Sequence, residues 1–104
     1  MPDEIKSIAN VDRLIHEPAR LAIVAVLSVS ESADFTHLLH ATGLSKGNLS
    51  AQLRKLEESD YITIAKSFRG KYPKTSAALT AKGRRAFRAY WRQYLTLARH
   101  LNQT

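Results

Sequence analysis

Two groups of polar and basic residues in this sequence have the types and the spacing of a nucleic-acid contact. In the first group, Leu49, Leu53 and Leu56 recur as the buried stripe of one helix, which leaves an opposite face for contact. The residues available for contact on this helix are Ser45, Lys46, Asn48, Ser50, Ala51, Gln52, Arg54 and Lys55. The small residues among them let a helix backbone approach a DNA groove closely.

The polar side chains of this group suit the edges of bases. Arg54 can pair with guanine or with a phosphate, and Asn48 or Gln52 can pair with adenine. Lys46 and Asn48 lie in the first turn, where recognition helices commonly touch base edges. For each residue the alternative is an ordinary solvated helix position.

The second group lies in a basic turn. Gly70 and Pro73 favour a stiff turn, and Tyr72 beside them can pack or stack. The cations of this turn are Arg69, Lys71 and Lys74. Such a turn can hold a phosphate backbone or enter a minor groove. The alternative is a hairpin whose basic residues merely keep its edge soluble.

The charge of the chain is unevenly distributed. The net charge of the 104 residues is +7. Residues 1–45 carry three bases and six acids, a balance of −3, whereas residues 46–104 carry thirteen bases and three acids, a balance of +10. This asymmetry favours a polyanionic partner, most often a nucleic acid. A soluble, solvated surface is the alternative interpretation.

The same sequence argues against an enzyme, a metal site and a cofactor. It has no cysteine, no glycine-rich phosphate loop and no recognisable Ser-His-Asp spacing. His37 and His40 share one helix face, but a metal usually needs four ligands and few carboxylates lie near them. We therefore expect no catalytic residue, no metal and no cofactor.

Length and hydropathy predict one soluble domain over residues 1–104. No apolar run approaches the roughly 18 to 20 residues of a membrane span, and the N-terminus is acidic rather than basic. We expect a cytoplasmic protein that has no membrane partner.

The periodicity of apolar residues predicts mostly helices and one hairpin. The first helix is expected from Asp3 to Ile15, with a break near Asn10 as the alternative to one continuous helix, and a second, central helix begins at Pro18. The later elements are a helix over 34–42 closed by Gly43, a helix over about 45–59 capped by Ser45, strands over 61–68 and 75–80 around a turn at 69–74, and a helix from Ala81 to about Asn102 capped by Thr80. The fold class is therefore mainly α with a small β-hairpin.

The last helix carries an apolar face that is too wide for one small core to cover. Its stripe, together with two residues of the first helix, predicts a homodimer interface made of Ile5, Ile8, Phe87, Tyr90, Trp91, Tyr94, Leu97, Ala98 and Leu101. A two-fold dimer would set two recognition helices about one DNA turn apart, roughly 34 to 36 Å. The alternative is that this helix folds back on its own domain.

Several short runs together resemble a known family. They are His16 to Leu21, Phe35 to Leu38, Gly43 to Ser50, Leu53 to Glu57, and Leu79 to Arg84 with Phe87. Over residues 10–98 the chain resembles the small MarR/ArsR-like winged helix regulators of bacteria and archaea. The resemblance implies a winged helix-turn-helix fold and a homodimer that binds DNA.

Two positions depart from the family pattern. Gln52 stands where a histidine is common, which can alter a base or phosphate contact. Ala77 and Ala78 stand where the second wing strand often has larger residues, which predicts a shorter or less well packed wing.

The sequence thus predicts a homodimeric, sequence-specific regulator of transcription that binds double-stranded DNA. The recognition helix over about 45–59 would enter the major groove, and the wing over about 69–74 would contact the backbone or the minor groove. Three alternatives stay open: a protein–protein interaction module, an RNA-binding protein, and a basic helix on an anionic membrane surface. No residue identifies a small-molecule effector.

Overall fold

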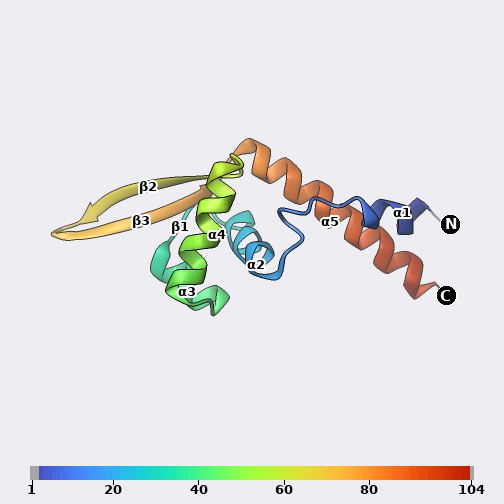
Figure 1. Cartoon of the computed structure of the whole chain (residues 1–104), viewed down its shortest axis with the longest axis horizontal. Helices are drawn as coiled ribbons and strands as arrows, with labels where there is room; N and C mark the ends of the chain where they lie inside the picture. Colours follow the sequence, from blue (N-terminus) through green and yellow to red (C-terminus); the bar gives the residue numbers. More distant parts are fainter. Residues whose placement is uncertain (1–2, 104) are drawn as a thin grey trace.

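The computed structural model describes residues 3–103 and shows three central helices between a hairpin and a long helix (Figure 1). The elements in chain order are α1 (Asp3–Ala9), α2 (Pro18–Ser28), β1 (Ala33–Asp34), α3 (Phe35–Thr42), α4 (Lys46–Glu58), β2 (Ile62–Arg69), β3 (Tyr72–Leu79) and α5 (Ala81–Asn102). The strands form an antiparallel sheet in the order β1-β3-β2. This arrangement confirms the predicted winged helix-turn-helix, in which α3 and α4 are the helix pair and β2 and β3 form the wing.

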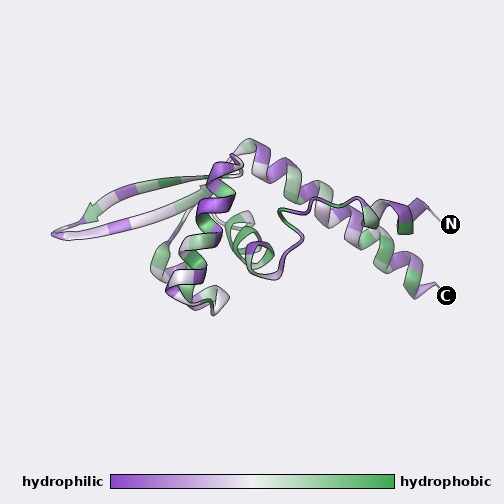
Figure 2. Ribbon diagram, in the orientation of Figure 1, coloured by the Kyte–Doolittle hydropathy of each residue, from purple (hydrophilic) through white to green (hydrophobic). Residues whose placement is uncertain are grey.

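The hydrophobic core lies between α2, α3, α4 and the base of the sheet. The predicted stripe of Leu49, Leu53 and Leu56 is buried there, against side chains that include Ile23 and Leu27 of α2. Burial of this stripe fixes the rotation of α4 about its own axis. Figure 2 shows the result as hydrophobic bands on α4 that alternate with hydrophilic ones.

Side-chain caps and one glycine set the bounds of the helix pair. The Asp34 carboxylate accepts from the backbone N–H of His37 at 2.8 Å and starts α3. Gly43 ends α3 in the left-handed region at φ 70°, as the sequence predicts. The Ser45 hydroxyl then accepts from the backbone N–H of Asn48 at 3.1 Å and starts α4.

Helix α1 ends at Ala9 and does not continue to Ile15, which agrees with the break near Asn10 that the sequence left open. The cause is Asp12, whose carboxylate accepts from the backbone N–H groups of Leu14 and Ile15 and from the Tyr61 hydroxyl. A side chain that captures nearby amides in this way competes with helix formation. The segment after α1 therefore crosses the domain as an irregular chain.

The wing is longer than predicted. Its strands have eight residues each, and the loop between them is only Gly70 and Lys71, with Gly70 at φ 63°. The expected turn over 69–74 is therefore wrong. At Ala77 and Ala78 the two strands stay paired, so the wing is not interrupted there, and looser packing than is usual in the family stays a prediction. Pro73 is tolerated in β3 because β1 pairs only with Ser76 and Ala77, which leaves that edge of β3 open at Pro73.

The molecule is elongated, with principal extents of 57 × 24 × 21 Å. Its Cα radius of gyration is 15.6 Å, compared with about 13 Å for a compact chain of this length. The wing projects at one end, and α5 with α1 projects at the other (Figure 1). Within residues 3–103, no helix has the length and apolar character needed to span a membrane.

We expect Gly83→Ala to lower the free energy of unfolding by about 1 to 3 kcal/mol, because an added Cβ would overlap the Tyr61 carbonyl. The matched control is Gly47→Ala in α4, where nothing lies within 4 Å of the added Cβ. Thermal denaturation of both variants would check this. Equal stability of the two variants would contradict the close approach of α5 to Tyr61.

Candidate nucleic-acid interface

The exposed face of α4 carries most of the predicted contact residues. Because the leucine stripe points inward, the side chains that face solvent are Ser45, Lys46, Asn48, Ser50, Arg54 and Lys55. Ala51 and Gln52 are half-buried on the flanks of this face. The structure therefore places the predicted α4 residues on one continuous surface. Among them, Gln52 forms hydrogen bonds to two other side chains of the protein.

The wing adds a second set of cations beside α4. Arg69 and Lys71 are exposed at its tip, and Lys74 is half-buried. An open groove of about 660 Å³ joins the wing to α4, with Ser50, Arg54 and Glu57 on one side and Ile64, Lys66 and Thr75 on the other. The recognition helix and the wing thus form one interface.

The cations of this interface are not neutralised by the protein. Within residues 3–103, the only ion pair joins Arg20 to Glu17 at 3.6 Å. Within residues 3–103, the basic side chains of α4 and the wing therefore form no ion pair within 4.0 Å, although the charge of Lys55 acts on Glu17 from farther away. They are available to phosphates, which is the contact that dominates affinity for DNA.

Sequence reasoning missed one feature of the wing, its exposed aromatic residues. Phe68 is 75% exposed and Tyr72 is 76% exposed. Phe68 lies on the same face of β2 as buried Ile62 and half-buried Ile64, so the alternation of the strand predicts that it points inward. The strand, however, continues beyond the core, where nothing covers the ring. The signal in the sequence for the exposure of Phe68 was its position near the wing tip, and not its place in the inward–outward alternation of the strand.

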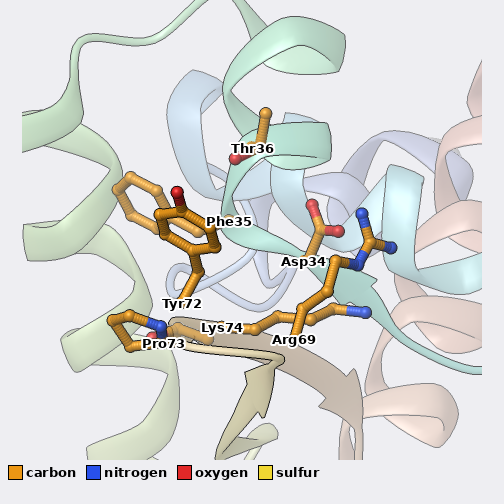
Figure 3. Close-up of a pocket in the computed structure, with 8 residues that line it drawn as sticks. Asp34, Phe35, Thr36, Arg69, Tyr72, Pro73 and Lys74 are labelled. Atoms are coloured by element: carbon orange, nitrogen blue, oxygen red, sulfur yellow. The ribbon is translucent and has the colours of Figure 1, made fainter.

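A second open hollow, of about 330 Å³, lies between the wing and the start of α3. Asp34, Phe35 and Thr36 form one wall, and Arg69, Tyr72, Pro73, Lys74 and Thr75 form the other. Figure 3 shows the rings of Tyr72 and Phe35 at one end of this hollow and the ends of Arg69 and Lys74 on the side of Asp34. The hollow thus has an aromatic end and a basic end.

A partly buried arginine links α2 to α4. Arg20 donates from Nε to the Leu14 carbonyl at 2.6 Å and from Nη1 to Oε1 of Gln52 at 2.8 Å. Gln52 in turn donates from Nε2 to Oδ1 of Asn48 at 2.9 Å. Gln52, which departs from the family pattern, is therefore tied at both ends of its amide to side chains of this protein.

The start of α2 is capped by a carboxylate that the sequence analysis did not single out. Glu17 accepts from the backbone N–H groups of Ala19 and Arg20 at 3.1 and 2.8 Å. Partial burial raises the pKa of Glu17, but the hydrogen bonds from these two amides and the positive charges of Arg20 and Lys55 outweigh burial and lower it. Glu17 thus remains ionised under the Arg20 guanidinium.

The predicted dimer face on α5 is partly available and partly not. Trp91 is 52% exposed, Tyr94 is 45% exposed and Leu101 is 55% exposed. Leu97 and Ala98 are half-buried, as are Ile5 and Ile8 of α1, which packs along α5.

Tyr90 is only 2% exposed, so its assignment to the dimer face is wrong. It packs with Val11 and Ile15, and its hydroxyl lies 2.9 Å from Nδ1 of His16. Phe87 is half-buried against both core clusters and has little surface left for a partner. The fold-back of α5 onto its own domain, which was the alternative, accounts for its first half.

Comparisons with known proteins agree with this geometry. Residues 19–97 match a family model described as a winged helix DNA-binding domain. The chain is also 33% identical over 89 residues to an uncharacterised protein of Methanocaldococcus jannaschii, and the match covers 86% of this chain and 97% of that protein.

Two solved structures have a similar fold. A transcriptional regulator homologue from Pyrococcus horikoshii superposes with a TM-score of 0.85 at 23% identity, covering 96% of this chain and 98% of that one. A MarR family regulator from Silicibacter pomeroyi superposes with a TM-score of 0.63 at 16% identity, covering 96% of this chain and 64% of that one. At these identities the likeness establishes the fold they share.

We expect Glu17→Ala to lower the free energy of unfolding by about 1 kcal/mol at pH 7, because it removes the cap of α2. The folded-state pKa of Glu17 lies below its ordinary value, so its charge stabilises the fold above the unfolded pKa of about 4.3. That contribution is lost as the pH falls through the folded-state pKa. Denaturant titrations at pH 7 and in the acid range would show the difference from wild type shrinking.

The control for this prediction is Glu31→Ala, which removes an exposed carboxylate outside the helices. It should change stability little at either pH. A loss for Glu17→Ala that stays constant into strong acid would contradict the role of the ionised carboxylate.

Proposed function

Because this chain belongs to the family of winged helix DNA-binding domains, we propose that it is a homodimeric, sequence-specific regulator of transcription that binds double-stranded DNA. The observation that carries the proposal is the basic surface formed by α4 and the wing, whose cations form no ion pair within residues 3–103. An enzyme is not what this family or this surface suggests.

In the proposed complex α4 lies in the major groove. Its first turn, with Lys46 and Asn48, would face base edges, while Ser45 near the helix start would lie at a phosphate. The small side chains of Ser50 and Ala51 allow close approach of the backbone. The longer side chains Arg54 and Lys55 would complete the contact, Arg54 to guanine or phosphate, while Gln52 lies at the edge of this contact with its amide bound to Arg20 and Asn48.

The wing would contact the neighbouring backbone or minor groove. Arg69 ends β2 and Lys71 lies in the two-residue loop at the tip, whereas Lys74 is the third residue of β3. The exposed rings of Phe68 and Tyr72 suit this place, because aromatic side chains pack well against sugars and base edges. Phe68 thus adds a second exposed ring to the one that the sequence offers at Tyr72.

A homodimer would be held by the part of α5 that leaves the domain. One side of this C-terminal half of α5 is covered by α1. There the Gln93 amide donates to the carbonyl and hydroxyl of Ser7 at 3.2 and 3.1 Å. Trp91 and Tyr94 lie on another side and stay about half exposed. Large apolar rings that stay half exposed to water mark a surface that a partner can cover. A second copy of the chain supplies a matching face, because a two-fold axis brings the same surface of both copies together.

We expect the purified protein to bind duplex DNA with a steep dependence on salt. A dimer that touches about 6 to 10 phosphates should lose about 10³ to 10⁵ in affinity between 50 and 200 mM salt. Titration of a random duplex pool, followed by selection of bound sequences, measures both affinity and half-site spacing. No binding to any duplex at 50 mM salt would overturn the proposal, and tighter binding to RNA competitor would favour the RNA alternative.

Two variants separate helix from wing in the same titrations. Arg54→Ala should cost about 1 to 3 kcal/mol on the selected site and relax base preference there. Lys71→Ala should weaken selected and scrambled duplexes alike and make the salt dependence shallower. Equal losses for Arg54→Ala on both duplexes would make Arg54 a phosphate contact.

We expect the double variant Trp91→Glu, Tyr94→Glu to be monomeric and to bind DNA much more weakly, because buried charges would oppose the α5 interface. Light scattering at tens of micromolar compares it with wild type. The control is Ala89→Glu, which places a carboxylate on another, exposed side of α5. A monomeric wild type, or a dimeric double variant, would show that the interface lies elsewhere.

A further inference from the structure

Three side chains form a continuous hydrogen-bond relay from α2 to the first turn of α4. The relay consists of Arg20, Gln52 and Asn48, joined by the bonds of 2.8 and 2.9 Å described above. Its inner end is fixed, because the Arg20 side chain is only 12% exposed and also binds the Leu14 carbonyl. Its outer end is Asn48, which is exposed on the surface assigned to DNA.

The direction of the relay follows from the chemistry of its inner end. A guanidinium has only donors, so Gln52 must turn its oxygen toward Arg20. The Gln52 nitrogen then faces Asn48, and since it can only donate, Asn48 must turn its own oxygen inward. With its oxygen turned toward Gln52, Asn48 presents its NH₂ group, which no bond of the relay uses, to an external partner.

We propose that Arg20 and Gln52 are positioning residues that hold Asn48 as a hydrogen-bond donor toward the major groove, an inference that rests on the proposed function. Guanine offers two acceptors there, O6 and N7, whereas cytosine offers only the N4 donor. Asn48 therefore selects guanine over cytosine at one base pair of each half-site. Its place in the first turn of α4 is where base contacts are made.

This inference replaces the expectation that Asn48 or Gln52 pairs with adenine. A bidentate contact to adenine needs the oxygen and the nitrogen of one amide side by side. In Gln52 the oxygen is bound by Arg20 and the nitrogen by Asn48. In Asn48 the oxygen is turned toward Gln52, so only half of the adenine pattern is available.

The decisive variant is Gln52→Glu, which should invert the relay. The new carboxylate still accepts from Arg20, but it has no donor for Asn48. Asn48 must then rotate its NH₂ inward and its oxygen outward. The base preference at the contacted pair should change from guanine to cytosine, whose N4 group is a donor.

The experiment compares two duplexes that differ only by reversal of one G·C pair at the position found by selection. Wild type should prefer guanine about fivefold or more, and Gln52→Glu should reverse the sign of the preference. Each ratio is taken within one variant, so the general loss caused by the added negative charge cancels. Asn48→Asp, which also presents only acceptors, should give the same reversal.

Gln52→Met serves as the control, because it breaks the relay without adding charge. It should flatten the preference and leave Asn48 free to rotate. The inference is overturned if Gln52→Glu keeps the wild-type base preference at every position of the site. It is also overturned if Asn48→Ala changes the base preference at no position.

A measurement without DNA separates this inference from the proposed function. In ¹⁵N-labelled protein, Arg20→Met and Asn48→Ala should each shift the Gln52 side-chain amide resonances, and unchanged resonances would overturn the relay. Wild type that binds duplexes without preferring guanine would overturn the base preference alone. Wild type that binds no duplex would overturn the proposed function and the base preference together.

Discussion

The rotation of α4 about its axis is the constraint on which the interface depends. Burial of Leu49, Leu53 and Leu56 determines it, because turning the helix would expose all three side chains at a cost of about 1.5 to 3 kcal/mol each. The same burial fixes which residues face outward. The apolar core of this small domain therefore orients the polar face of the helix without any contact to a ligand.

The features that the sequence predicts well are the local ones. The caps Ser45 and Thr80, the glycine that ends α3 and the leucine stripe each depend on residues three or four positions apart. The outward face of α4 follows from them directly. This is why the helix pair agrees with the expectation to within a residue or two.

The features that failed depend on contacts between distant residues. Asp12, which holds the irregular segment after α1, also binds Tyr61 49 positions away, and Tyr90 is buried against Val11 and Ile15 of that distant segment. Burial and the Asp12 carboxylate raise the pKa of Tyr61 to about 12, so the tyrosine keeps its proton in this bond. The direction of the Gln52 amide also depends on Arg20, a residue of another helix. No periodicity within one segment contains this information.

The length of the wing determines how much DNA one subunit would cover. A strand of eight residues is about 26 Å long, which equals the rise of roughly seven or eight base pairs. The footprint of each subunit would therefore extend well past the base pairs under α4. In the proposed complex with a dimer, the sugar-phosphate backbone would be protected from cleavage reagents on both outer flanks of the site. The bases that are read would lie only under the two copies of α4.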